Sequence, residues 1–264
     1  MNVFRREFWS RRIALIAWCV SMILFVWTSM VKFQTLTADT SATSQLLQSM
    51  PDTIKTIFGM NGLDAVTLPG YFGICFLFIA IMLAVHAGLL GSSLLTVEPL
   101  TKTSEFLYTR PTSRWRIVRA KYAVGILHLI ALWIATAASS YVSITLYASM
   151  HGFGRLLMVF MAAAAIIQIV FFALGISTAA CAASAQTPAR VVAMLVFASY
   201  ALSLVSHLAG YELLRFASIF RAFDAVAIVA SSTLSVRYVA MYTCLAVLLL
   251  VSGTGYFLRR DLHS

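Results

Sequence analysis

The sequence predicts an all-α polytopic membrane protein with six transmembrane helices and both termini in the cytoplasm. Of the 264 residues, 61% are hydrophobic and 11% are charged, whereas a soluble domain has about 45–50% apolar and about 25% charged residues. The apolar runs are continuous, which favours helices, because the strands of a membrane barrel alternate apolar and polar residues. The net charge of +10 lies beside the apolar runs, so it indicates membrane topology rather than nucleic-acid binding.

Six apolar runs are long enough to cross a bilayer, since a spanning helix needs about 20 apolar residues. The second run opens with Pro69, a residue type favoured at the start of a helix, and the fifth run follows Pro188. The fourth run exceeds the thickness of the hydrocarbon, so we expect it to tilt or protrude. We therefore expect a single transmembrane domain over residues 1–264, with spans at about residues 13–31, 69–95, 122–149, 156–185, 189–209 and 237–258.

Basic residues are distributed unequally between the two sides of these spans. Thirteen lysines and arginines fall on the side of the termini and of the loop at residues 96–121, and six fall on the other side. Because Lys and Arg are retained on the cytoplasmic side, we expect a multi-pass protein of the cytoplasmic (inner or plasma) membrane with cytoplasmic termini. The start of the chain is similar to a twin-arginine signal at Arg11 and Arg12. The apolar run after it is too long for a cleaved signal peptide.

Two segments on the opposite side are amphipathic and too polar to span. Residues 45–60 place their large apolar side chains on one helical stripe. Residues 211–234 combine aromatic residues with four charged residues, which prevents them from crossing hydrocarbon comfortably. We expect both segments to form amphipathic or re-entrant pieces on the outer face.

The sequence lacks the motifs of a nucleotide-binding site and of a hydrolase. None of its four lysines follows a glycine, so no P-loop is present, and no H-E-x-x-H, G-x-S-x-G or C-x-x-C motif occurs. The four cysteines lie in apolar runs and indicate small buried residues rather than disulfides or metal ligands. His86 and His128 fall within spans, where an ionisable group is a functional candidate. Hydrogen bonding of a neutral histidine to a neighbouring helix explains each position equally well.

The loop at residues 96–121 is polar and basic, although apolar spans flank it on both sides. Pro111 divides the loop, because the residue before a proline resists the α region. We expect a short helix at residues 101–109 and a second helix that continues into the third span. The first helix would expose the apolar side chains of residues 106–108, which indicates a binding partner rather than a solvated loop.

Residues of this loop match many positions of a longer sequence pattern. That pattern begins with an acidic residue, continues as Gly-Thr-x-Glu-Phe-Leu-Leu-x-x-Pro-x-Ser-Arg, and ends with an Ile/Val pair and Gly-Lys. With this pattern the chain resembles the permease subunits of ABC-2-type exporters, a group that includes sodium-extrusion and antibiotic-resistance permeases. Pro99 departs from it by replacing a second acidic residue, and Ser104 and Ala120 stand where glycine or similar small residues are common. Residues 50–71 and 218–224 resemble the same family. The matching loop residues are Glu98, Thr103, Glu105, Phe106, Leu107, Pro111, Ser113, Arg114, Ile117, Val118 and Lys121.

The resemblance implies a permease subunit that moves a substrate across the cytoplasmic membrane with ATP hydrolysed by a separate ATPase subunit. Two permeases, copies or paralogues, would pair in the lipid bilayer, and each would dock one ATPase through the loop as a coupling helix. The ATPase would bind ATP and Mg²⁺, so no cofactor, metal or catalytic residue is expected in this chain, and no nucleic-acid partner. The residues implied in ATPase coupling are Glu98, Glu105, Phe106, Leu107, Tyr108, Arg110, Pro111, Arg114 and Arg116.

The implied coupling residues divide into two kinds. Residues 105–108 would insert into a groove of the ATPase, whereas Arg110, Arg114 and Arg116 would meet its acidic rim or anionic lipid head groups. Two other functions stay open. A sensor or assembly scaffold would bind an ATPase through the same loop without transporting anything. A membrane-embedded enzyme acting on lipid would need a Ser/His/Asp or metal cluster near one interface, and the sequence shows none.

Overall fold

The chain folds into long helices that run side by side. The computed structural model describes residues 3–38, 45, 49–60, 62–96, 114–148, 151–182, 184, 186–209 and 214–259. Within these residues the regular structure is helical, and six helices are long and apolar enough to cross a membrane, which confirms the predicted all-α, six-span fold class. The six are α1 (Val3–Ala38), α4 (Leu68–Leu94), α7 (Arg114–Tyr147), α8 (Gly154–Cys181), α9 (Thr187–Ala209) and α13 (Val236–Arg259).

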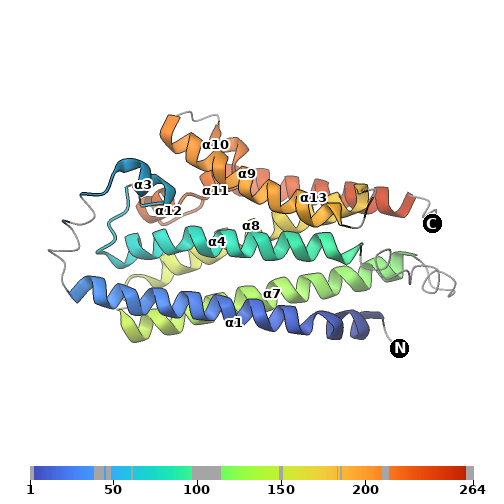
Figure 1. Cartoon of the computed structure of the whole chain (residues 1–264), viewed down its shortest axis with the longest axis horizontal. Helices are drawn as coiled ribbons and strands as arrows, with labels where there is room; N and C mark the ends of the chain where they lie inside the picture. The colour runs from blue at the N-terminus through green and yellow to red at the C-terminus, as the bar shows by residue number, and fades with distance from the viewer. Residues whose placement is uncertain are drawn as a thin grey trace.

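The two ends of this bundle differ in what they carry. At one end α1 begins, α4 ends, α7 begins and α13 ends (Figure 1), and we call this the loop end. The opposite end, the short-helix end, carries the pieces expected to be amphipathic, and they fold as short helices there (Figure 1). These short helices are α3 (Asp52–Ile57), α10 (Leu214–Ala217), α11 (Ile219–Ala222) and α12 (Ala225–Ser231).

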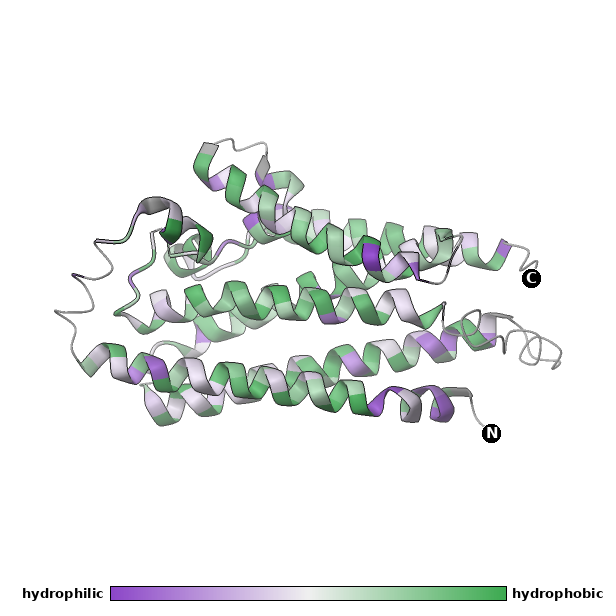
Figure 2. Cartoon of the chain, in the orientation of Figure 1, coloured by the Kyte–Doolittle hydropathy of each residue, from purple (hydrophilic) through white to green (hydrophobic). Residues whose placement is uncertain are grey.

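Hydropathy along the helices agrees with a bilayer around their middle parts. Figure 2 shows hydrophobic residues along most of each long helix and hydrophilic residues gathered at the starts of α1 and α7. α1 runs unbroken from Val3, so its basic start continues the first span instead of forming a separate helix. Large apolar side chains on α1 and α13, such as Ile13 and Val251, are exposed, as expected of surfaces that face lipid.

α4 and α8 form the centre of the bundle, because they are the most buried of the six long helices. α4 packs chiefly on α8, while α1 packs on α7 and α13 packs on α8. The two central helices cross closely at glycines. A Cβ added at Gly91 would collide with the carbonyl oxygen of Phe172, and one added at Gly175 would collide with the carbonyl oxygen of Gly88. Small residues of this kind let two backbones approach within a membrane.

Partly buried hydrogen bonds link the central helices to their neighbours. The Tyr71 hydroxyl on α4 donates to the carbonyl of Ser29 on α1 at 2.8 Å. The Trp133 indole on α7 donates to the carbonyl of Met161 on α8 at 2.8 Å. Each bond satisfies a polar group that would otherwise face hydrocarbon, so these contacts fix how the helices lie against one another.

Replacing Gly91 with alanine should destabilise the bundle, because the new Cβ has no room against the backbone of α8. Overpacking at such a site costs about 1–3 kcal/mol, so the midpoint of thermal unfolding in lipid nanodiscs should fall. Gly255→Ala on α13 is the matched control, since nothing lies within 4 Å of a Cβ there. The control should unfold at an equal or higher temperature, because alanine favours a helix over glycine. Equal midpoints for wild type and Gly91→Ala would refute the close crossing.

Candidate coupling site at the loop end

The structure describes only the edges of the loop to which the sequence assigns ATPase coupling. α4 ends at Leu94, and α7 begins at Arg114. Arg116 lies exposed on the first turn of α7. The other predicted coupling residues lie outside the described part of the chain: Glu98, Glu105, Phe106, Leu107, Tyr108, Arg110 and Pro111.

Lys121 of α7 caps the last turn of α4. Its side chain is 2% exposed, and its Nζ donates a hydrogen bond to the carbonyl oxygen of Leu94. The last carbonyls of a helix lack partners within the helix and carry a partial negative charge, so a buried ammonium group there is favourable. The Thr96 hydroxyl donates to the carbonyl of Ser92 at 2.9 Å, which satisfies a second carbonyl of this turn.

Arg11 of α1 binds the same end of α4 from another side. Its guanidinium donates to the carbonyl of Ser93 at 3.1 Å and also to the Ser93 hydroxyl. Its Nε donates to the carboxylate of Glu7, one turn earlier on α1, at 3.0 Å. Glu7 is 7% exposed, so its charge is balanced within the structure. We call Glu7, Arg11, Ser93, Leu94 and Lys121 the polar clasp, because together they join α1, α4 and α7.

The first turns of α7 have an inward and an outward face. Ile117 and Val118 are 4% and 2% exposed and anchor the helix against the bundle. Arg116 and Arg119 are exposed, and the Trp115 side chain keeps 57% of its accessible surface. A large aromatic side chain between arginines suits a protein interface or the boundary between lipid and water. The sequence-based site included Arg116 and missed Trp115.

The two histidines predicted within spans lie close to α1. The His128 ring meets the Phe8 ring edge-on, with centroids 5.6 Å apart, and the His86 ring meets Trp18 in the same way at 5.4 Å. Both side chains are buried. Among the described residues, His86 Nδ1 and His128 Nε2 have no hydrogen-bond partner. The sequence analysis allowed that each histidine is hydrogen-bonded to a neighbouring helix. Within the described structure, these two ring nitrogens do not make such a bond.

The sequence did not predict most of the polar clasp. Arg11 and Lys121 were noted there only as topology signals or family matches. The pair of Glu7 and Arg11 does carry a local signal, since residues four apart share one face of a helix. Ser93 lies 82 residues from Arg11, and nothing in a single sequence links two such positions. Among the described residues, no three His, Cys, Asp or Glu side chains gather closely enough to hold a metal ion.

The six apolar helices among the described residues define a multi-pass membrane protein. The family model described as "ABC-2 family transporter protein" matches residues 1–262. The chain therefore belongs to the ABC-2 family and is a permease component of an ABC transporter, which confirms the resemblance of the loop. A comparison with curated proteins gave no match.

A double-mutant cycle should show that Arg11 and Ser93 stabilise the fold together. Arg11→Met and Ser93→Ala should each lower the free energy of unfolding, and the double variant should lose less than their sum. The coupling energy should be about 1.5–3 kcal/mol, the range of a hydrogen bond to a charged group. Reversible denaturant unfolding in mixed micelles measures it.

The neighbouring Arg12 provides the control for this cycle. Arg12 is exposed, and its guanidinium lies over the Trp9 ring of the same helix, 4.2 Å from the ring centroid. Arg12→Met combined with Ser93→Ala should therefore be additive. Additive behaviour of the Arg11 pair as well would contradict the polar clasp.

Proposed function

We propose that this chain is the permease subunit of an exporter whose separate ATPase docks at the loop end. Its loop, residues 96–121, would face the cytoplasm and receive the ATPase, and the subunit would pair with a second permease in the cytoplasmic membrane. ATP and Mg²⁺ would then be bound by the ATPase. The observation that carries this proposal is the family match over residues 1–262, together with a loop whose two edges are held by one polar clasp.

The distribution of charge supports a cytoplasmic loop end. Hydrophilic residues gather at the starts of α1 and α7 (Figure 2), and thirteen of the lysines and arginines belong to that side of the spans. The positive-inside rule counts this kind of excess near the ends of short loops. Because α13 also ends at the loop end (Figure 1), both termini would lie in the cytoplasm.

The polar clasp supports mechanical coupling through the loop. Lys121 and Arg11 hold the last turn of α4, and Ile117 and Val118 anchor the first turns of α7. A push on the segment between them would therefore move α1, α4 and α7 together, as expected for coupling through packed, rigid elements. The close crossing at Gly91 would pass the movement on to α8.

The sequence of the loop supplies a docking surface of suitable chemistry. We assign residues 105–108 to a groove of the ATPase, because an apolar triplet after a glutamate fits a buried interface centre. Arg110, Arg114 and Arg116 would meet an acidic rim or anionic lipid, and Trp115 would extend this surface onto α7. Charged residues at the rim of an interface mainly govern the rate of association.

Phe106→Asp should weaken ATPase docking without affecting insertion into the membrane. A buried charge at the centre of an interface should weaken binding at least about tenfold, so co-purification of the co-expressed ATPase should fall accordingly. The matched control is Phe58→Asp, the same change on a side chain that is 44% exposed at the short-helix end. It should leave ATPase recovery unchanged. Undiminished recovery with Phe106→Asp would refute the docking role.

Reconstitution of the complex separates a transporter from a sensor. ATP hydrolysis in proteoliposomes that rises with a transported compound, and falls with Phe106→Asp, supports transport. If the ATPase binds but no exported compound changes its rate of ATP hydrolysis, the result would instead favour a sensor or scaffold.

A further inference from the structure

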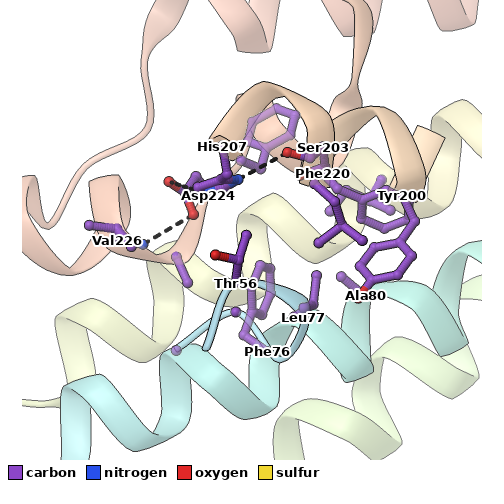
Figure 3. Close-up of a pocket in the computed structure, with 16 residues that line it drawn as sticks. Thr56, Phe76, Leu77, Ala80, Tyr200, Ser203, His207, Phe220, Asp224 and Val226 are labelled. Carbon is purple, nitrogen blue, oxygen red and sulfur yellow. Dashed lines mark hydrogen bonds and ion pairs between the residues drawn. The ribbon is translucent and has the colours of Figure 1, made fainter. Parts of the chain in front are cut away.

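The pocket at the short-helix end offers no room for a ligand. It lies between α4, α8, α9 and the short helices α3, α11 and α12, and side chains fill it (Figure 3). Phe76, Ala80 and Ile167 of its lining are only 1–2% exposed, so the space beside them admits little more than water. Asp224 is already neutralised by the Arg221 guanidinium, which donates to its Oδ2 at 2.6 Å. An open and charged surface lies at the other end of the bundle, at the start of α1.

One exposed stripe of α1 changes from basic to apolar along the helix. Residues that follow one another at intervals of four and three share one face of an α-helix. We call the six residues selected by this spacing the α1 stripe, and all six are exposed: Arg5, Trp9, Arg12, Ile16, Val20 and Ile23. Figure 2 shows the start of α1 as hydrophilic and its continuation as mostly hydrophobic.

Trp9 lies between the two arginines of the α1 stripe and holds one of them in place. The Arg12 guanidinium lies over the Trp9 ring, 4.2 Å from the ring centroid, and Arg5 lies one turn before Trp9 on the same face. Stacking on a ring occupies the face of a guanidinium, so its in-plane N–H groups stay available for a phosphate. Trp9 keeps 53% of its accessible surface, and tryptophan is enriched at the level of the lipid head groups.

No described carboxylate competes for these two arginines. Glu7 is the only acidic residue in the described parts of the six long helices. It is 7% exposed and pairs with Arg11 on the opposite side of α1 from the α1 stripe. Among the described residues, Arg116 and Arg119 at the start of α7 are also exposed and add positive charge at this end. A basic surface without acidic neighbours attracts anionic groups.

The apolar part of the α1 stripe suits an acyl chain. Ile16, Val20 and Ile23 are 59%, 49% and 38% exposed, and Ile16 follows Arg12 by one turn. A phospholipid carries its charged head group and its chains in the same order along the bilayer normal. One lipid can therefore place its phosphate at the arginines and a chain along the apolar residues.

We propose that the α1 stripe binds an anionic glycerophospholipid of the surrounding leaflet. The lipid phosphate accepts hydrogen bonds from Arg5 and Arg12 beside Trp9, and one acyl chain lies along Ile16 and Val20. Arginines next to a transmembrane helix favour anionic lipid, about fivefold for each residue. A choline head group is disfavoured, because its own cation is repelled by the two guanidinium groups. The proposal goes beyond the transporter function and depends neither on ATPase docking nor on which end faces the cytoplasm.

Photolabelling of the wild-type protein locates the lipid. The full chain is placed in phosphatidylcholine nanodiscs that contain a small amount of phosphatidylglycerol or phosphatidylcholine with a diazirine in one acyl chain. The ratio of phosphatidylglycerol to phosphatidylcholine labelling should be at least about fivefold higher at Ile16 and Val20 than at Leu245 and Leu248. These two leucines lie exposed on α13. Equal ratios on α1 and α13 overturn the proposal.

Two double variants with the same change of charge test the arginines. Arg5→Gln combined with Arg12→Gln should lower the labelling ratio at the α1 stripe to the value found on α13. The matched control is Arg155→Gln combined with Arg237→Gln, which neutralises two exposed arginines at the short-helix end. The control should keep the ratio of the wild type. A ratio that survives the loss of Arg5 and Arg12 overturns the proposal.

Lysine replacements separate a defined site from a diffuse attraction to positive charge. Arg5→Lys combined with Arg12→Lys keeps both charges but removes the planar groups that stack on Trp9 and bind phosphate oxygens in pairs. This variant should lose at least about half of the preference for phosphatidylglycerol. Full retention of the preference would show a diffuse attraction only and would overturn the site.

The complex with the ATPase tests whether a protein covers the α1 stripe instead. Labelling of Ile16 and Val20 by the phosphatidylglycerol probe should persist in the purified complex, because the lipid occupies the membrane-facing side of α1. If the bound ATPase suppresses this labelling, the arginines belong to a protein interface and the proposal is wrong.

Discussion

The last turn of α4 is the point on which the rest of this structure depends. Its carbonyls lie at the edge of a membrane domain, where unpaired backbone groups are costly. They accept hydrogen bonds from side chains of two other helices. Lys121 comes from α7 and Arg11 from α1. These contacts fix where the second span stops and where the third begins, and therefore where the loop between them projects. A coupling element needs this kind of fixed support on both sides.

α4 connects the two ends of the molecule. Near its end it carries Ser93 and Leu94 of the polar clasp. In the turns just before them it crosses α8 at Gly88 and Gly91, and toward its start Gly73 lies against Ala225 of α12. A displacement of its last turn would therefore move both α8 and the helices at the short-helix end. Close backbone packing at the glycines leaves little free space between α4 and α8, which favours movement of these two helices as one body.

The apolar runs were sufficient to predict the six-span fold class, because burial in lipid demands long continuous helices. The helices nevertheless extend beyond the apolar runs, and α1 starts at Val3, because polar residues at a helix end prolong it without entering hydrocarbon. The loop pattern was sufficient to predict the family. It could not reveal the bonds from Arg11 to Ser93, because such pairings depend on how helices pack. The ATPase-coupling role of residues 105–108 stays a prediction.

Site-specific photocrosslinking tests the central claim, that the loop end receives the ATPase, most directly. A photoreactive phenylalanine analogue at position 115, where Trp115 is exposed on α7, should form a covalent adduct with a co-expressed ATPase in intact membranes. The same analogue at position 58, at the short-helix end, should form none. Adducts from position 58 with none from position 115 would contradict the account.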